Sequence, residues 1–271
     1  MNNFETEIEK GERYSFGKNW RGFLATLNDD RIKEAENSLL QLLKIANLKG
    51  LKFLDAGSGS GLFSLSARRL GATVVSFDFD PESVACTSHL QSRYCPNDAD
   101  WKVLRGSVLD DKFLGGLGHF DIVYSWGVLH HTGKMWMAID NAASMVKTGG
   151  ILCIAIYNHQ GQRTAVWLRA KQIYCSGFLG KAAMSSIFIP YFFCRTVIGS
   201  LLKRENQFAT YKKNRGMAIF HDWHDWLGGL PFEAAKVEDI FHYARKKGFV
   251  LTNLVTCDGF GCNQFVFIRS S

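Results

Sequence analysis

The residues with the clearest chemical potential lie in a turn rich in glycine. An apolar run ends in Asp55, and Gly57, Gly59 and Gly61 follow at alternate positions, with Ser58 between the first two. Glycine adopts positive φ without strain and lacks the Cβ atom that would keep a ligand away from the backbone. An amphipathic run begins at once, so the free N–H groups of a helix start can face the same ligand. The turn therefore predicts a binding site for a nucleotide-like molecule.

A second carboxylate, Asp78, ends the next apolar run and precedes Phe79. A carboxylate in this place can accept hydrogen bonds from both hydroxyls of a ribose. The glycine spacing is G-x-G-x-G, and Leu62 stands where the dinucleotide fingerprint G-x-G-x-x-G has its third glycine. Asp55 also suits a cationic group, such as an amino-acid ammonium, better than a pyrophosphate. These features disfavour a nicotinamide oxidoreductase, which stays as an alternative class.

A second motif makes the assignment more specific. Residues 120–125 form an apolar run with an aspartate in second place, and residues 126–131 follow it and end in two histidines. This segment resembles motif IV of the class I S-adenosylmethionine (SAM) dependent methyltransferases, and the turn at 55–61 resembles their motif I. The Gly-Gly pair at 149–150 matches the usual turn into their fifth strand. Bacterial methyltransferases of the type 11/12-like group, with no assigned substrate, look most similar.

The resemblance implies SAM as the cofactor and S-adenosylhomocysteine (SAH) as the product. Ser107 stands where family members often carry an acid that binds the adenine amine, and a serine replaces that contact only in part. The cofactor-binding residues implied by the resemblance are Asp55, Gly57, Ser58, Gly59, Gly61, Asp78, Phe79, Ser107, Val108, Ser125 and Trp126.

Strand and helix signals alternate around these motifs. The apolar runs predict strands at 51–55, 73–78, 101–105, 120–125 and 151–157, and 249–256 with 264–268 can form a closing antiparallel hairpin. Amphipathic runs predict helices at 29–43, 62–70 and 237–247, and another that opens at Pro81. The fold class is therefore α/β. We expect a Rossmann-like, doubly wound, seven-stranded sheet with a reversed terminal hairpin, plus a helical insertion after the fifth strand.

Four parts are expected along the chain. Residues 1–47 form an N-terminal helical arm or lid, 48–158 the SAM-binding core, 159–235 a helical substrate-recognition insertion, and 236–271 the helix and hairpin that complete the sheet. Aromatic residues gather in the arm, and their faces would attract a sulfonium if the arm folded over it. Docking of the arm to the core is the alternative. These residues are Tyr14, Phe16, Trp20 and Phe23.

Composition sets broad limits on the kind of protein. Of the 271 residues, 46% are hydrophobic and 21% are charged, which is ordinary for a soluble globular chain. Seven cysteines without a C-x-x-C pair and a polar N-terminus favour a reduced, cytoplasmic protein over a secreted one. The net charge of +7 is concentrated between Arg163 and Arg215, where Glu205 is the one acid. This segment favours an anionic partner, or it is a solvated basic helix face.

The most apolar stretch, Ala182 to Leu202, lies inside this basic segment. Pro190 and Arg195 interrupt it, which disfavours a membrane span. A buried helical cap and a peripheral membrane contact through 182–204, assisted by flanking cations, stay open. Nucleic acid is not expected as a partner, because the aromatic residues of the insertion have apolar neighbours typical of buried rings. The oligomeric state is left open.

Two pairs of histidines could act on an acceptor. His130 and His131 follow the fourth strand, where the carboxyl ends of parallel strands would place a base beside the acceptor. A role in stabilising the loop is the alternative. His221 and His224 have no cysteine or further acid at ligand spacing, so no metal is expected. These two would wall the acceptor pocket or cap a helix. The substrate-binding candidates are Tyr157, His221, His224, Trp223 and Trp20.

The sequence therefore predicts an enzyme. We expect a SAM-dependent methyltransferase that O-methylates a small or lipid-linked hydroxylated acceptor, such as a sugar, a natural product or a quinol-like compound, with His130 or His131 as the base. Methylation of RNA or of a protein side chain is the alternative substrate class. A non-catalytic SAM-binding module is the alternative to an enzyme. The identity of the acceptor does not follow from the residues.

Overall fold

The computed structural model describes residues 4–203, 206, 223, 226–259 and 261–270. The chain forms two compact units. Asn28–Gln160 and Phe232–Ser271 make up the sheet unit, and Met1–Leu27 and Gly161–Pro231 make up the helical unit. The sequence suggested boundaries near 47, 158 and 235, and the functional roles of those four parts stay predictions.

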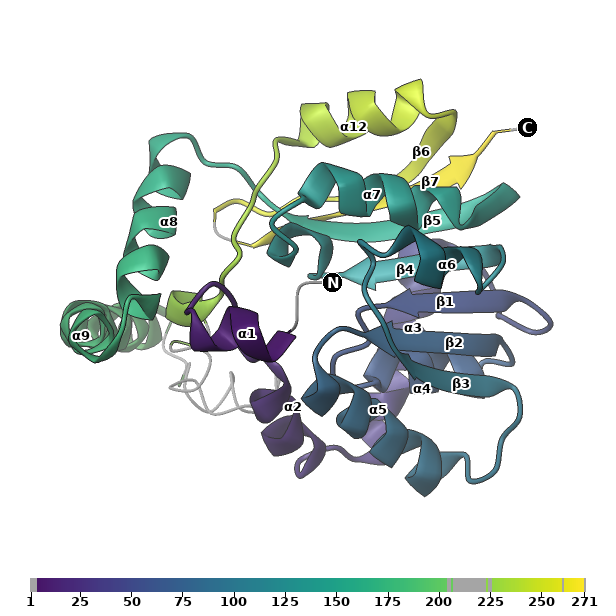
Figure 1. Cartoon of the computed structure of the whole chain (residues 1–271), viewed down its shortest axis with the longest axis horizontal. Coiled ribbons are helices and arrows are strands. Elements are labelled where there is room, and N and C mark those ends of the chain that lie inside the picture. The colour runs from purple at the N-terminus through teal and green to yellow at the C-terminus, as the bar shows by residue number, and fades with distance from the viewer. Residues whose placement is uncertain (1–3, 204–205, 207–222, 224–225, 260, 271) are drawn as a thin grey trace. The chain divides into compact units, whose positions relative to one another are not determined.

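The sheet unit contains one seven-stranded sheet in the order β3-β2-β1-β4-β5-β7-β6 (Figure 1). The strands β1 to β5 are parallel, whereas β7 runs antiparallel to both β5 and β6. The predicted fold class, with its reversed terminal hairpin, is confirmed. The strands are β1 (Lys52–Ala56), β2 (Thr73–Asp78), β3 (Trp101–Arg105), β4 (Phe120–Trp126), β5 (Val146–Tyr157), β6 (Phe249–Val255) and β7 (Cys262–Arg269).

Short polar side chains begin the helices of this unit. The Asn28 side chain accepts a hydrogen bond from the Arg31 N–H, Asp80 accepts one from Glu82, and Asp110 accepts one from Phe113. Each bond satisfies an N–H group that the first helical turn leaves without a partner. The helices are α3 (Asp29–Leu43), α4 (Leu62–Arg69), α5 (Pro81–Tyr94), α6 (Asp111–Gly115), the 3-10 helix η1 (Leu129–His131), α7 (Met135–Ser144) and α12 (Val237–Lys246).

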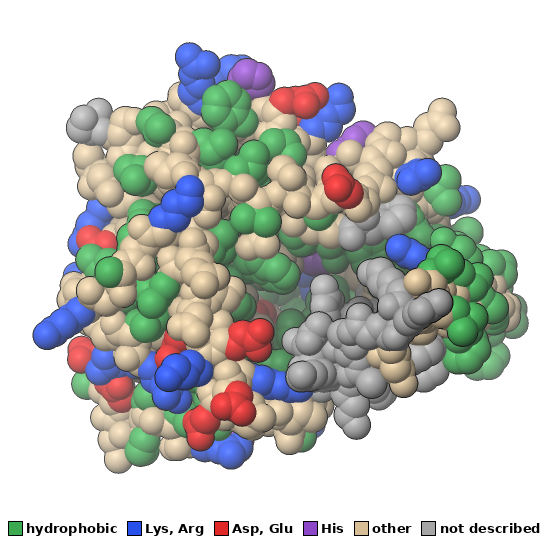
Figure 2. Space-filling view, turned by 180° about the vertical axis from the view of Figure 1, so that it is seen from behind, with side chains coloured by type: hydrophobic (Ala, Val, Ile, Leu, Met, Phe, Trp, Pro, Cys, Tyr) green, Lys and Arg blue, Asp and Glu red, His purple; other side chains and the backbone are tan. Residues whose placement is uncertain are grey.

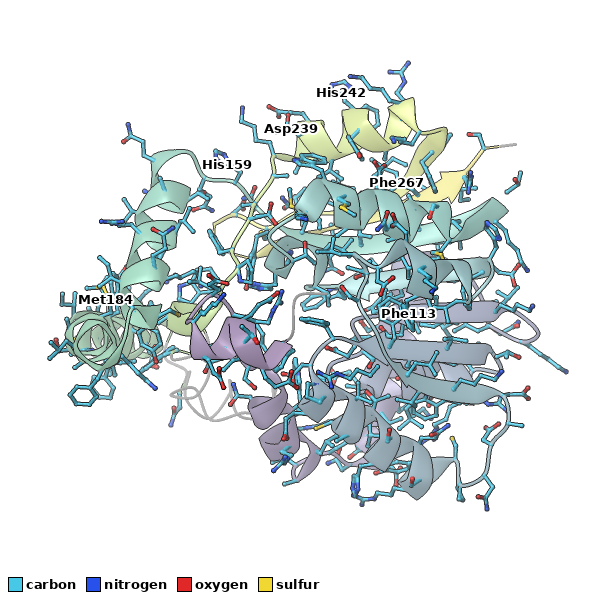
Figure 3. The ribbon with its side chains drawn as sticks, viewed as in Figure 1. Phe113, His159, Met184, Asp239, His242 and Phe267 are labelled. Atoms are coloured by element: carbon cyan, nitrogen blue, oxygen red, sulfur yellow. The ribbon has the colours of Figure 1, made fainter. Side chains whose placement is uncertain are left out.

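Successive side chains of the strands point to opposite faces of the sheet. Leu54 and Val123 join a buried apolar cluster with Ile139 of α7 and Ile240 of α12. Phe113 and Phe267 belong to the same layer, whereas Asp239 and His242 lie on the exposed surface of α12 (Figure 3). Asp55, Ser76 and Tyr124 occupy paired positions on the neighbouring strands β1, β2 and β4. They point to the opposite face, where Ser64 of α4 contacts Asp55.

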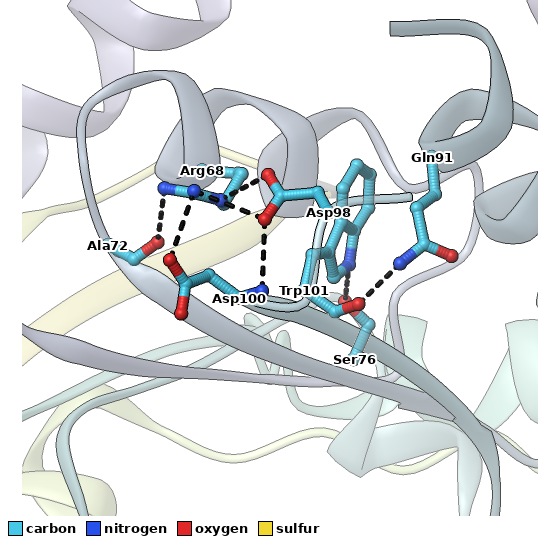
Figure 4. Close-up of polar contacts among 7 residues, drawn as sticks. All are labelled: Arg68, Ala72, Ser76, Gln91, Asp98, Asp100 and Trp101. Atoms are coloured by element: carbon cyan, nitrogen blue, oxygen red, sulfur yellow. Dashed lines mark hydrogen bonds and ion pairs between the residues drawn. The ribbon is translucent and has the colours of Figure 1, made fainter. Parts of the chain in front are cut away.

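An arginine holds the end of α4 to the start of β3 (Figure 4). The Arg68 guanidinium donates to Asp98 at 2.6 Å, to Asp100 at 3.3 Å and to the carbonyl of Ala72 at 3.2 Å. The pKa of Asp98 is lowered, chiefly by its hydrogen bond from Arg68. Trp101 follows this cluster, and its side chain is buried. The amino ends of β2 and β3 are therefore joined by charge-assisted bonds.

The helix α3 belongs to the sheet unit, although it precedes the first strand. Its residues Ile32 and Leu39 are fully buried, and α3 packs against α4. Arg69 of α4 donates to Glu36 of α3 at 2.8 Å. The apolar stripe read from the sequence over 29–43 therefore faces the core of the sheet unit.

The helical unit contains α1 (Phe4–Glu9), α2 (Gly17–Leu24), α8 (Gln162–Cys175) and α9 (Phe178–Lys203). Its core is an aromatic cluster in which Trp167 stacks on Phe192 at 6.0 Å and Met184 packs alongside (Figure 3). The N-terminal arm is bound to the far end of the insertion, because the Tyr14 N–H donates to the Leu230 carbonyl at 2.9 Å. A Cβ on Gly228 would lie 2.3 Å from the Tyr14 ring, so the backbone approaches that ring closely.

Candidate active site

The glycine-rich turn joins β1 to α4 with three residues in the left-handed region. The φ values are +89° at Gly57, +54° at Gly59 and +82° at Gly61. A Cβ on Gly57 would lie 2.4 Å from a methyl group of Val128, and one on Gly61 would lie 2.8 Å from the Cα of Thr87. Both glycines are therefore required for packing against neighbouring segments as well as for backbone conformation.

Asp78 lies beside this turn at the end of β2. Its carboxylate accepts a hydrogen bond from the Gly59 N–H at 2.9 Å and another from the Asp80 N–H at 2.9 Å. Burial raises the pKa of Asp78 to about 6, against the lowering effect of these amide bonds. The Gly57 N–H also donates to the Phe77 carbonyl at 2.8 Å. Hydrogen bonds therefore join the Asp78 carboxylate to the glycine-rich turn. This carboxylate is the group that the sequence analysis assigned to a ribose.

Asp55 is buried directly beneath the turn, with 2% of its surface exposed. The Ser64 hydroxyl donates to Asp55 Oδ2 at 2.5 Å. Burial raises the pKa of Asp55 to about 7, the Ser64 bond lowers it, and the nearby Asp78 carboxylate raises it further. When ionised, these two carboxyl groups give the surroundings of the turn a negative electrostatic potential, which suits a ligand with a positive charge.

The remaining predicted cofactor residues lie at the same edge of the sheet, after the carboxyl ends of β2, β3 and β4. The Ser107 hydroxyl accepts the Leu109 N–H at 3.1 Å, and Val108 is buried next to it. The Ser125 hydroxyl donates to the Ala56 carbonyl at 2.7 Å and is fully buried, so its side chain links two strand ends. Trp126 is 43% exposed. Phe79 follows Asp78 and is half-buried.

The two histidines after β4 differ in exposure. His130 is fully buried, and its ring centroid lies 4.0 Å from that of Tyr157 and 4.5 Å from that of His131. His131 is half-buried and meets the Tyr157 ring edge-on at 5.3 Å. Phe232 lies on the other side, 5.4 Å from Tyr157. The histidine pair and Tyr157, which ends β5, therefore form one aromatic cluster at the carboxyl edge of the sheet.

Glu233, which the sequence reading did not select, bonds at two points to residues 130–135, which are called the histidine segment below. Its backbone N–H donates to the His130 carbonyl at 3.0 Å, and its carboxylate accepts the Met135 N–H at 2.9 Å. The second bond satisfies an N–H group at the start of α7. Burial raises the pKa of Glu233 despite its bonds to backbone amides. The run Pro-Phe-Glu at 231–233 was visible in the sequence, but its contact with residues a hundred positions away was not.

The other predicted acceptor residues lie in the helical unit or outside the described residues. The Trp20 ring packs edge-on against Phe23 at 6.1 Å on α2. Trp223 is buried against Phe192 at 5.8 Å. His221 and His224 lie outside the described residues. The roles of all four in acceptor binding stay predictions.

Asp121, the acid of the second motif, lies at the opposite edge of the sheet. It accepts the Lys52 N–H at 2.8 Å and the Lys147 ammonium at 2.7 Å. Burial acts to raise the pKa of Asp121, but the bonds from Lys147 and Lys52 outweigh it and lower the pKa. This residue therefore joins the amino ends of β1, β4 and β5, and it takes no part in the candidate site.

The site can bind a nucleotide-like cation and present a histidine to a second molecule. Asp55, Asp78 and the glycine turn form its electronegative half, and His131 with Tyr157 forms its aromatic half. Within the described ranges no group of three or more histidine, cysteine or acidic residues could hold a metal ion.

Comparison with known proteins gives consistent results. The family model described as "Methyltransferase domain" matches residues 27–198, which is more than half of the chain. The ubiquinone biosynthesis O-methyltransferase of Pelagibacter ubique is 28% identical over 139 residues, which are 50% of this chain and 55% of that protein. The protein of the same name from Brucella ovis is 30% identical over 111 residues, which are 41% of this chain and 43% of that one. The chain thus matches about half the length of these curated relatives.

A solved structure extends the similarity over the whole fold. The crystal structure of magnesium protoporphyrin IX methyltransferase from Synechocystis PCC 6803 with bound SAH has a TM-score of 0.60 to this chain. The match covers 98% of this chain and 100% of that one, at 16% sequence identity. At that level of identity the similarity shows a shared fold.

Replacement of Glu233 by alanine should loosen the histidine segment without unfolding the protein. The variant leaves the Met135 N–H without its acceptor, and a lost bond to a charged acceptor costs roughly 1.5–3 kcal/mol. We expect amide hydrogen exchange at 130–135 to rise by about tenfold or more, while exchange in the central strands stays unchanged. Glu238→Ala, on the exposed surface of α12, serves as the control. Unchanged exchange at 130–135 would mean that aromatic packing and the backbone bond from residue 233 to the His130 carbonyl hold these residues without the carboxylate.

Proposed function

The chain belongs to the methyltransferase domain family, and on this premise we propose that it is a SAM-dependent O-methyltransferase for a small or lipid-linked hydroxylated acceptor. Family membership confirms the resemblance read from the two sequence motifs, and SAM is the cofactor that this family and fold imply. The observation that carries the proposal is the electronegative glycine turn beside an aromatic cluster with a half-buried histidine, at one edge of the sheet.

Each cofactor group has a partner of suitable chemistry in this proposal. Asp55 supplies a negative charge beneath the turn for the cationic amino-acid part, and Asp78 accepts bonds from the ribose hydroxyls. The adenine edge lies at Ser107 and Val108. The bound cofactor supplies a methyl group that its sulfonium already activates, so the protein contributes mainly positioning, worth roughly 7–11 kcal/mol of barrier in favourable cases.

A histidine of the pair 130–131 takes the proton of the acceptor hydroxyl in this proposal. Histidine titrates in the range in which a base at neutral pH must work. His131 is the better placed of the two because it is half-buried, whereas the His130 ring is fully buried and packs against both His131 and Tyr157. His130 then orients its neighbour, and Tyr157 lines the acceptor side.

A quinol-like acceptor is the class that we favour. The relatives from Pelagibacter ubique and Brucella ovis carry the name ubiquinone biosynthesis O-methyltransferase, which supports a hydroxylated ring. The aromatic rings of Tyr157 and Phe232 would pack against such a ring. We place the enzyme in the cytoplasm, at the surface of a membrane.

The exposed face of α9 supports this peripheral membrane contact. Among the described residues, Phe178–Leu202 is the stretch long and apolar enough to cross a membrane by length and composition, and little of it is buried. Hydrophobic side chains gather over this helix (Figure 2), and Leu179 and Leu202 are each 81% exposed. An apolar surface of this kind on a folded unit marks a contact site.

Two features favour binding of α9 to the surface of an anionic bilayer over a membrane-spanning position of this helix. One side of α9 is already occupied, because Met184 and Phe192 pack in the aromatic cluster with Trp167. The exposed Arg195 lies within the helix and would be costly at the centre of a bilayer. Residues 163–203 contain basic side chains and no acid, so the charge matches anionic lipid. In this proposal α9 lies in the plane of the membrane surface.

Asp78→Ala should weaken SAH binding, measured by calorimetry, by on the order of 2–4 kcal/mol, because the ribose loses two charge-assisted hydrogen bonds. Asp121→Ala is the matched control, since this motif aspartate lies at the opposite edge of the sheet, and it should leave SAH affinity unchanged. Equal affinities in Asp78→Ala and the unaltered protein would show that the ribose lies elsewhere.

His131→Ala should lower the rate of methyl transfer to a short-chain hydroquinone by about 10²-fold or more, with SAH affinity unchanged. The unaltered protein should gain activity as the pH rises through the titration of a histidine. His242→Ala, on the exposed side of α12, is the control. A rate that does not change with pH between about 5.5 and 8, nor with substitutions at both histidines, would exclude them as the base.

The acceptor class is tested separately with labelled SAM. Labelled methyl groups on RNA or on protein, with none on hydroxylated compounds, would disprove the acceptor class.

Flotation with lipid vesicles tests the membrane contact. The protein should float with vesicles that contain phosphatidylglycerol and much less with pure phosphatidylcholine, and salt should weaken the binding. The combined change Leu179→Gln, Ile187→Gln and Leu201→Gln should abolish flotation. The combined change Val250→Gln and Val255→Gln, on the exposed face of β6, should not. A chain that stays in solution with anionic vesicles, or that forms a dimer lost in the α9 variant, would show that the face binds something else.

A further inference from the structure

A continuous chain of hydrogen bonds runs through the sheet unit and ends at Asp55. The Trp101 indole N–H donates to Ser76 Oγ at 2.8 Å (Figure 4). Ser76 Oγ donates to Ser64 Oγ at 2.7 Å, and Ser64 Oγ donates to Asp55 Oδ2 at 2.5 Å. The four residues come from β3, β2, α4 and β1, and each is at most 2% exposed.

When Asp55 is ionised, the direction of this chain is fixed by its two ends. An indole nitrogen can donate a hydrogen bond but cannot accept one. Ser76 must therefore accept from Trp101. An ionised carboxylate can only accept, so the Ser64 hydroxyl donates its proton to Asp55 and must accept from the Ser76 hydroxyl. Every donor points towards the carboxyl group, and hydrogen bonds to a carboxylate favour its ionised form. Successive bonds in a dry interior also strengthen one another.

Among the residues that the structure describes, the other groups that face Asp55 do not supply a positive charge. Asp78 at the end of β2 is a like charge, and burial raises the pKa values of Tyr124 on β4 and Cys153 on β5. On α4, the guanidinium groups of Arg68 and Arg69 are bound to Asp98 and Glu36. Ser64 supplies both hydrogen bonds that lower the pKa of Asp55, the larger effect from its side chain and a smaller one from its backbone, and both oppose the effect of burial.

We propose that Trp101, Ser76 and Ser64 are positioning residues that favour the ionised form of Asp55 beneath the glycine turn, so that the turn can offer a counter-charge to the cationic amino-acid part of the cofactor. This inference rests on the proposed function, since it takes a SAM-like molecule as the ligand. None of the three side chains needs to touch the cofactor, because they act through the carboxylate.

The sign of the pH dependence follows from the titration of Asp55. Below its pKa of about 7 the carboxyl group is neutral and offers no counter-charge, whereas above it the group is ionised. The affinity for a ligand with an ammonium group should therefore rise with pH through this range. Loss of the serine donor raises the pKa, so the rise should move to higher pH.

Two ligands separate this effect from ribose binding. SAH carries the amino-acid part, whereas 5′-methylthioadenosine contains the same adenosine without it. The ratio of their affinities, measured by calorimetry between about pH 5.5 and 8.5, cancels the titration of Asp78, because both ligands contain the ribose. In the unaltered protein this ratio should increase with pH, with a midpoint near 7.

Ser64→Ala should shift that midpoint upward by about one unit and lower the ratio at pH 7 several-fold, since a hydrogen bond to a charged group corresponds to roughly one to two pKa units. Ser76→Ala and Trp101→Phe should shift it in the same direction and by less. Asp55→Asn should give a low ratio that does not change with pH. Ser66→Ala is the matched control, because this buried serine of the same helix bonds to the Leu62 carbonyl instead.

The outcomes discriminate clearly. A midpoint that is the same in Ser64→Ala, Ser76→Ala and Ser66→Ala, in variants that remain folded by circular dichroism, would overturn the positioning role. A ratio that is independent of pH in the unaltered protein would also overturn it. Failure of both SAH and 5′-methylthioadenosine to bind at any pH would instead disprove the proposed function. Shifts in the chain variants, with none in the control, would support the inference.

Discussion

The site depends on two carboxyl groups that the fold buries at the ends of neighbouring parallel strands. Burial favours the neutral form of an acid, and it raises the pKa of Asp55 to about 7 and of Asp78 to about 6. The surrounding structure opposes this effect with hydrogen-bond donors: the backbone amides of Gly59 and Asp80 for Asp78, and Ser64 for Asp55. Negative charge is therefore held at the turn at a cost in stability, and a cationic ligand would relieve that cost.

The second half of the site is assembled from segments far apart in the chain. Glu233 bonds to both ends of the histidine segment, and Phe232 packs on Tyr157. In the proposed function, the acceptor side is thereby fixed to the end of β5 and to α7, whereas the cofactor side is fixed to β1 and β2. Such a division allows the acceptor side to differ between relatives while the turn stays the same.

The helical unit has a different physical character. Its aromatic core occupies one side of α9, while the other side exposes apolar residues that water solvates poorly. Basic residues and the absence of acids over 163–203 give this surface a single sign of charge. A methyltransferase with such a surface can meet acceptors that partition into membranes, which agrees with the quinol-like class proposed for it.

Local patterns in the sequence determined most of the sheet unit. Apolar runs of strand length, capping residues such as Asn28 and Asp80, and the glycine spacing each depend on neighbours a few positions away, so they could be read directly. For the same reason the turn and Asp78 were identified correctly as neighbours at one edge of the sheet. Motif membership was a weaker guide, since Asp121 belongs to a motif but lies at the other edge.

Only the tertiary structure decided what each polar side chain contacts. The hydrogen-bond chain from Trp101 to Asp55 joins four elements, and the bonds of Glu233 span about a hundred positions. Local residue spacing therefore predicts neither set of contacts. The exposure of α9 was likewise open in the sequence, because an apolar helix can be buried or exposed with the same residues. The physical reason is common to all three: burial and hydrogen-bond partners are properties of packed neighbours, and one chain brings those neighbours together only when it folds.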